Sequence, residues 1–342
     1  MTKANLAAAL LSLLLVSPTR AVETPRYRLL KKAVLGGEGG WDYFVYDAPS
    51  RRLFLSRATH TWVVDGNSLA VVGDIPETEG VHGIALAPDL GRGFTSDGKS
   101  SQVTAFDLKT LAVLGRFKTG EGPDAILYDA ASRRLFTFNG RGRSATALDP
   151  LTGKILGSLA LDAKPEFAAA DGRGTVYVNL EDKNSLAAID AVTLKVKAVW
   201  PLAPCAEPTG LAIDAAARRL FAVCSNKMMA VVDADNGKVL AAPAIGERPD
   251  AAVLDAGARL AFSSNGEGTL TAVSADAPYG VVDTIATQKG ARTLALDPVG
   301  HRVFVVTAEF GAPPKDAPSR ARPQALQGTF AVLVYGLGPA AP

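Results

Sequence analysis

A unit of about 42 residues recurs seven times along this chain of 342 residues. Its clearest marker is a turn aspartate followed, seven residues later, by a phenylalanine at the centre of a short apolar run. Five copies match closely: 47–54, 129–136, 214–221, 255–262 and 297–304. The copy at 87–94 lacks the aspartate, and the copy at 171–177 is one residue shorter and ends in Tyr177. A chain with this period must fold as seven similar units.

Each unit contains four short runs that are rich in β-branched and aromatic residues and are bounded by Gly, Asp, Asn or Pro. In the third unit these runs are 123–129, 134–138, 145–148 and 154–159, and they have the length and composition of strands. Helical repeats of similar length would need long amphipathic segments. The repeat therefore predicts an all-β fold: a single seven-bladed β-propeller over residues 27–338, with four antiparallel strands per blade.

The two ends of the repeat predict how the ring closes. The last unit supplies only three strands, at 292–296, 302–306 and 329–335. The segment 27–35 precedes the first complete unit and runs into a glycine-rich stretch like the one that follows a fourth strand elsewhere. We expect it to pair beside 329–335 as the missing strand, because this pairing removes an open sheet edge.

The first 21 residues have the features of a secretory signal peptide. Lys3 precedes an apolar run at 6–16, and small residues follow up to Ala21. The run is shorter than the ~20 residues of a spanning helix, so no membrane insertion is expected. We expect a periplasmic or secreted protein after cleavage near Ala21. Without Lys3 and Arg20 the 36 basic residues fall to 34, which equals the number of acidic residues, so net charge does not identify a partner.

The chain has two cysteines, and the predicted blade places them at one edge of the fifth unit. Cys205 comes just before the first strand and Cys224 ends the second. An antiparallel hairpin would bring them together, and an oxidising compartment favours a disulfide between them. The alternative is two buried thiols.

The second strands carry a recurring pattern of aromatic, hydroxyl and amide residues, as in Phe136-Thr137-Phe138-Asn139 and Phe262-Ser263-Ser264-Asn265. The pattern resembles the YVTN repeat of exported seven-bladed propellers, including the YncE-like proteins, over residues 27–336. The resemblance implies a periplasmic protein without enzyme chemistry. Because single-stranded DNA binding is known in the YncE-like group, it also implies single-stranded nucleic acid as one partner.

One residue per unit, at the start of the first strand, is expected to line the channel mouth: Asp42, His82, Asp124, Glu166, Thr209, Asp250 and Arg292. Four of the seven are acidic, and like charges crowded at an axis need a cation or the Arg292 guanidinium to offset them. A metal site built from Asp124, Glu166 and Asp250 is one interpretation, and calcium or another divalent ion would suit these ligands. The alternative is that these side chains only cap turns after prolines, with no cofactor.

The loops between second and third strands carry basic residues that would form a rim on the same face: Arg57, Lys99, Arg141, Arg143, Lys183, Lys227 and Arg322. Such a rim would attract an anionic chain or a phosphate-bearing ligand. Ordinary solvated loop charge is the alternative. Trp41 and Phe167, beside mouth positions, would stack on a ligand or pack between blades.

The proline-rich segment 309–327 interrupts the last unit and is expected to lie over this face, as a lid, as a loop that docks a partner, or as an insertion without a role. The sequence lacks the metalloprotease, serine-hydrolase, P-loop and haem-attachment motifs. We expect a monomeric, non-catalytic propeller that binds an anionic ligand or a periplasmic protein. The alternative is a metal-dependent lactonase-like hydrolase with its acidic site at the mouth.

Overall fold

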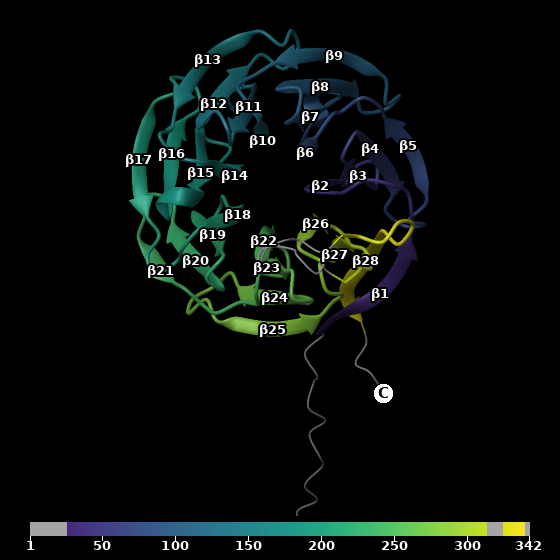
Figure 1. Cartoon of the computed structure of the whole chain (residues 1–342). Helices are drawn as coiled ribbons and strands as arrows, with labels where there is room; N and C mark the ends of the chain where they lie inside the picture. The colour runs from purple at the N-terminus through teal and green to yellow at the C-terminus, as the bar shows by residue number, and fades with distance from the viewer. Residues whose placement is uncertain (1–25, 313–323, 339–342) are drawn as a thin grey trace, which may run out of the picture.

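The computed structural model describes residues 26–312 and 324–338, which form strands and two short 3₁₀ turns, η1 (Pro88–Leu90) and η2 (Glu181–Lys183). Seven four-stranded antiparallel sheets surround one axis, and the first strand of each sheet lies innermost (Figure 1). The chain is therefore the seven-bladed β-propeller that its repeat predicted. The predicted signal peptide at 1–21, Arg322 and most of the proline-rich segment lie outside the described residues.

The blades are numbered in chain order. Blades 1 to 4 consist of β2 (Phe44–Asp47), β3 (Arg52–Arg57), β4 (His60–Asp65) and β5 (Val71–Ile75); β6 (Val81–Ala87), β7 (Arg92–Asp97), β8 (Gln102–Asp107) and β9 (Val113–Lys118); β10 (Pro123–Asp129), β11 (Arg134–Asn139), β12 (Ser144–Leu148) and β13 (Ile155–Ala160); and β14 (Pro165–Ala170), β15 (Thr175–Leu180), β16 (Ser185–Asp190) and β17 (Val196–Pro201). Blades 5 to 7 consist of β18 (Pro208–Asp214), β19 (Arg219–Cys224), β20 (Met228–Asp233) and β21 (Val239–Ala241); β22 (Pro249–Asp255), β23 (Leu260–Asn265), β24 (Thr269–Ser274) and β25 (Val281–Ala286); and β26 (Thr293–Asp297), β27 (Arg302–Thr307), β28 (Ala331–Gly338) and β1 (Arg26–Val34).

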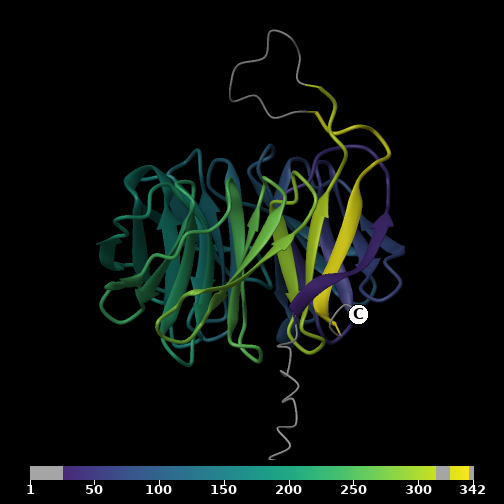
Figure 2. The same cartoon turned by 90° about the horizontal axis from the view of Figure 1, so that it is seen from below.

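The ring closes through β1, as the sequence predicted. This strand comes from the N-terminal side of blade 1 yet pairs antiparallel with β28, from Arg26 opposite Gly338 to Val34 opposite Ala331. Figure 2 shows β1 crossing the outside of blade 7 beside β28. The pairing ties both ends of the described chain into one sheet and covers the edge that β28 would otherwise expose.

The aromatic residue of each repeat forms the core between blades. The phenylalanines of the second strands are completely or almost completely buried, at positions 54, 94, 136, 221, 262 and 304, and Tyr177 takes the same place in blade 4. Phe54 of blade 1, for example, packs on Phe106 of blade 2 with ring centroids 5.5 Å apart. Burial of these large side chains explains why the aromatic is the most regular feature of the repeat.

The basic residues near the start of the second strand hold neighbouring blades together on the face that carries the turns between first and second strands, here called the lower face. Arg134 of blade 3, for instance, donates to the backbone oxygen of Ala191 in blade 4 at 2.9 Å. Every seam has a contact of this kind: Arg52 to Leu108, Arg92 to Pro150, Arg134 to Ala191, Arg218 to Asp171, Arg219 to Tyr279, Arg259 to Asp214, His301 to Asp255 and Arg302 to Asn67. The repeat thus encodes both the core of each blade and its attachment to the next.

Blade 5 contains a disulfide between Cys205 and Cys224, whose Cα atoms are 5.7 Å apart. It joins the loop before β18 to the end of β19, on the edge where the hairpin model placed both cysteines. Over the residues that the structure describes, no helix has the length and apolar character needed to cross a membrane.

Candidate functional site

The face on which the first strands begin, here called the upper face, gathers the seven predicted mouth residues into one charged ring. His82 Nδ1 donates to Asp42 Oδ2 at 2.7 Å and lies 3.7 Å from Asp124 Oδ1, so blades 1, 2 and 3 are linked. Arg292 of blade 7 pairs with Asp250 of blade 6 and lies 4.0 Å from Asp42. Five of the predicted mouth residues are therefore neighbours, namely Asp42, His82, Asp124, Asp250 and Arg292.

Neighbouring cations offset part of the negative charge of the ring. Lys164, two residues before Glu166, places its ammonium 3.3 Å from Glu166 Oε2 and also pairs with Glu181. Thr209, the neutral member, donates to the backbone oxygen of Pro249. The carboxylates of the mouth are thus offset by His82, Lys164 and Arg292, and the predicted compensation by Arg292 is one part of this arrangement.

Burial and neighbouring charges shift the pKa values of the titratable side chains in the ring. The pKa of Glu166 is raised to about 8, first by burial and then by the negative charge of Asp124. The pKa of Asp124 is also raised by burial, whereas the hydrogen bond to Asp42 raises the pKa of His82. These directions favour a protonated Glu166 near neutral pH and a cationic His82 to a higher pH than usual.

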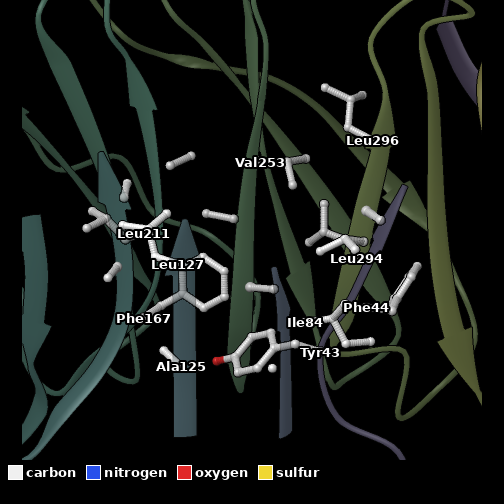
Figure 3. A pocket seen from close by; sticks show the side chains of 18 of the residues that line it. Tyr43, Phe44, Ile84, Ala125, Leu127, Phe167, Leu211, Val253, Leu294 and Leu296 are labelled. Carbon is white, nitrogen blue, oxygen red and sulfur yellow. The ribbon is translucent and has the colours of Figure 1, made fainter. Parts of the chain in front are cut away.

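Two aromatic side chains meet across the channel below the ring. Tyr43 of blade 1 and Phe167 of blade 4 meet in a tilted arrangement with ring centroids 4.8 Å apart, and Figure 3 shows the two rings next to each other. At the same level blades 2, 3, 5 and 6 have Gly83, Ala125, Gly210 and Ala251. A Cβ on Gly210 would lie 2.6 Å from the Cα of Ala251, so this level accepts only small neighbours. We call the Tyr43 and Phe167 pair the plug.

Above the plug lies a cavity of about 550 Å³, here called the upper pocket, on the side of blades 4 to 7. It is lined by four mouth residues, by Lys164, Arg248 and Lys289, and by the aromatic rings of Trp41 and Phe310. Phe310 and Ala325, which pair in an isolated bridge, also line it. Both belong to the proline-rich segment 309–327, so its described ends form part of the pocket wall.

The structure corrects the predicted rim at Arg57. Its side chain is 1% exposed and lies between the rings of Phe330, 3.9 Å away, and Trp62, 4.7 Å away. Its guanidinium donates to the backbone oxygens of Gly36 and Glu38, and burial lowers its pKa to about 10. Arg57 therefore holds the chain entering blade 1 against blade 7 and does not meet a ligand.

The other described rim residues are exposed, but two of them are already paired. Arg143 lies 2.8 Å from Asp182, and Lys227 lies 2.8 Å from Glu247. Lys99, Arg141 and Lys183 are exposed, and Arg141 donates to the backbone oxygen of Gly98. The structure does not gather these cations around the upper pocket.

Of the four cations that line the upper pocket, only Arg292 was predicted, as a mouth residue. Lys164, Arg248 and Lys289 lie in the loops that enter blades 4, 6 and 7, just before the first strands. The predicted rim contained only basic residues of the loops between second and third strands. Their spacing could have predicted this location, because each of these three cations stands two or three residues before a mouth position in the aligned repeat.

The metal set Asp124, Glu166 and Asp250 is also corrected. Among the described residues, the group whose ligand atoms lie within 4.8 Å of one another is Asp42, His82 and Asp124. Glu166 and Asp250 are instead held by Lys164 and Arg292. Asp250, in blade 6, also lies across the axis from Asp124 in blade 3.

Comparisons with known proteins show the fold. No family model matches the sequence, and no curated protein matches it significantly. The solved structure of U3-55K superposes with a TM-score of 0.73 at 10% identity, over 91% of this chain and 99% of that one. The structure of the RRP9 WD40 repeats superposes with a TM-score of 0.74 at 10% identity, over 90% of this chain and 97% of that one. A structure of Kuenenia stuttgartiensis hydrazine synthase superposes with a TM-score of 0.67 at 16% identity, over 78% of this chain and 92% of that one. These similarities show the seven-bladed β-propeller fold.

Proposed function

We propose that this chain is a non-catalytic binding propeller that holds a small organic anion in its upper pocket. The observation that carries the proposal is that two cations in the pocket wall have no carboxylate partner among the described residues. Arg248 and Lys289 are exposed, and neither forms an ion pair with any described residue. The other cations of the pocket, Lys164 and Arg292, are already neutralised by carboxylates. Two unpaired cations in one concave site attract an anion.

The remaining lining suggests what the anion carries. Trp41 and Phe310 lie with their ring centroids 6.2 Å apart, and both line the pocket. The cavity of about 550 Å³ is within the range of small-molecule sites. An anion with an aromatic or apolar part would place its charge near Arg248 and Lys289 and its apolar part against these rings. A protein partner that inserts such a group uses the same features.

The family and location of the protein are part of the proposal. The YVTN-like residues form buried networks: Thr137 donates to Asn139 Oδ1 at 3.1 Å, and Asn139 donates to Thr146 at 3.0 Å. This supports membership of the exported YVTN-repeat, YncE-like group. The predicted leader and the disulfide of blade 5 support the periplasm or another oxidising compartment. We propose that the protein acts there as a monomer without a cofactor.

Charge reversal tests the pocket. The double variant Arg248→Glu and Lys289→Glu should bind 8-anilinonaphthalene-1-sulfonate, an aromatic anion, roughly 10- to 100-fold more weakly than the wild type, because both attractive charges become repulsive. The wild-type affinity should fall as salt is raised from low to high concentration. Fluorescence titration with purified mature protein measures both. The matched control is Lys99→Glu with Lys183→Glu, which changes the net charge equally at exposed positions outside the pocket.

Equal loss of affinity in the two double variants would contradict the proposal, because it would show a general charge effect. A fluorescein-labelled oligothymidylate tests the family's other partner. If it binds and loses affinity mainly in the Lys99 and Lys183 variant, the ligand is an extended single strand on the rim and not a small anion in the pocket.

A metal-dependent lactonase-like hydrolase is the second candidate, favoured by the grouping of Asp42, His82 and Asp124. Carboxylate and imidazole ligands fit a divalent ion such as calcium or zinc. However, the hydrogen bond to Asp42 uses His82 Nδ1, and the raised pKa of His82 means that a metal must displace a proton. These two features disfavour metal binding by Asp42, His82 and Asp124.

Elemental mass spectrometry of protein purified without chelator distinguishes the two candidates. We expect less than stoichiometric amounts of any divalent ion. One bound ion per chain that is lost in Asp42→Asn with Asp124→Asn, and a lactone-hydrolysing activity that is lost with it, would favour the hydrolase instead. Glu166→Gln is a useful comparison, because it changes a mouth carboxyl outside the candidate metal group.

A further inference from the structure

Below the plug, the central channel forms a second cavity of about 430 Å³, here called the lower cavity. Its walls are the first strands of all seven blades, and it extends from Tyr43 and Phe167 at one end to Tyr46, Leu254 and Leu296 at the other. The last three immediately precede the turn aspartates that end these strands on the lower face. The plug thus separates two sites of different chemistry on one axis.

The side chains that line the lower cavity are mostly apolar, while the free inner edges of the first strands also bring backbone polar groups to its wall. The lining contains no charged residue, and its side-chain polar atoms are the hydroxyl groups of Tyr43 and Tyr46. The Tyr46 hydroxyl already accepts a hydrogen bond from Arg302. Figure 3 shows Leu127, Val253 and Leu296 around the cavity, each from a different blade.

The sequence of the first strands explains this lining. A strand with one face on a core and one face on water alternates apolar and polar residues. Several first strands here are apolar in succession, as in Ala125-Ile126-Leu127 and Ala251-Ala252-Val253-Leu254. Leu127, Val253 and Leu296 nevertheless remain half-buried rather than buried, so part of this apolar surface is still accessible to solvent.

We propose that the lower cavity is a binding site for one small, uncharged, apolar molecule, such as a short aliphatic chain or a compound of one or two aromatic rings. The apolar side chains on the wall favour an apolar ligand, because its binding removes apolar surface of both partners from water. A charged ligand is excluded, because no described lining residue could pair with its charge. The volume of about 430 Å³ is near the lower end of the range for small-molecule sites. The site goes beyond the proposed function and does not depend on it.

The test uses N-phenyl-1-naphthylamine, an uncharged two-ring probe that fluoresces in apolar surroundings. The mature protein should bind one probe per chain with an affinity that is insensitive to salt and unchanged by Arg248→Glu with Lys289→Glu. Filling the cavity with Leu127→Phe and Val253→Phe should weaken binding at least ~10-fold. The matched control is Leu114→Phe with Val282→Phe, which makes the same two replacements at positions 48% and 59% exposed on outer strands.

Absence of saturable binding to the wild type would overturn the proposal, as would equal affinity of the cavity and control variants. If the filled variant fails to fold, Val253→Thr keeps the side-chain shape and adds a hydroxyl. It should weaken probe binding several-fold while circular dichroism remains that of the wild type, and an unchanged affinity there would also overturn the proposal.

Discussion

A chain that lacks residues 26–34 is expected to lose its stable monomeric fold. The deletion removes β1 and with it the whole antiparallel ladder to β28 and the buried Tyr27 side chain. Net contributions of about 1 kcal/mol per hydrogen bond and roughly 2–3 kcal/mol for the buried ring give a loss on the order of 5–10 kcal/mol. This is comparable to the whole stability of an ordinary domain. Thermal unfolding and size-exclusion chromatography should show an unfolded or self-associating protein.

A circular permutant separates strand pairing from chain connectivity. Arg26 lies opposite Gly338, so residues 26–34 can follow residue 338 through a short hairpin turn, which gives blade 7 the connectivity of the other blades. The permutant should recover a folded monomer. A permutant as unstable as the deletion would show that the covalent tie between β1 and blade 1 closes the ring. A deletion variant that stays folded would show that packing between blades is sufficient.

The repeat could predict the blades and their closure because each unit carries its own local instructions. The turn aspartate, the buried aromatic and the four short strands are close in sequence, and the missing fourth strand could be counted. The role of the basic residue before the aromatic was not predicted. Arg134 and Arg302 bind backbone or side-chain atoms of the next blade, and contacts between units depend on how the ring brings distant residues together.

Some parts of the candidate site could likewise be predicted from the sequence, and others could not. The mouth ring could be predicted because it occupies one position per repeat, whereas Arg57 could not be placed correctly. Its burial depends on Phe330 of blade 7, and the sequence separates the two residues by most of the ring. The plug was missed for a similar reason, because Tyr43 and Phe167 belong to blades across the axis. Their contact also requires small residues at the same level of the other blades.

Asp97 provides a test of the repeat at one buried position. It is 1% exposed and accepts hydrogen bonds from Thr95 at 2.7 Å and Thr104 at 2.6 Å. In blade 3 the equivalent residue is Asn139, which accepts from one threonine and donates to another. Blade 2 therefore buries a carboxylate where its neighbour buries an amide, and burial raises the pKa of Asp97 to about 6.

Asp97→Asn is expected to stabilise the protein by on the order of 1–3 kcal/mol at pH 7.5. The folded state binds the Asp97 proton more tightly than the unfolded state, whose carboxyl has an ordinary pKa near 3.8. The free energy of unfolding of the wild type therefore loses this contribution as the pH rises from about 4 through about 6, and the loss persists above pH 6. The asparagine does not titrate and can donate to Thr104. Thermal unfolding between pH 4.5 and 8 should show a gain for the variant that grows with pH.

The reverse substitution is the matched control, because it places the same carboxylate in the same surroundings one blade away. Asn139→Asp should destabilise the protein by a similar amount at pH 7.5 and much less near pH 4.5, since protonation restores a donor toward Thr146. A variant Asp97→Asn that is less stable than the wild type at pH 7.5 would contradict this account. It would mean that the two threonine hydroxyl groups stabilise the Asp97 carboxylate by more than burial destabilises it. Position 97 of blade 2 would then require a side chain that only accepts hydrogen bonds. Opposite signs for the two substitutions, both growing with pH, would establish that the amide is the residue this position of the repeat favours.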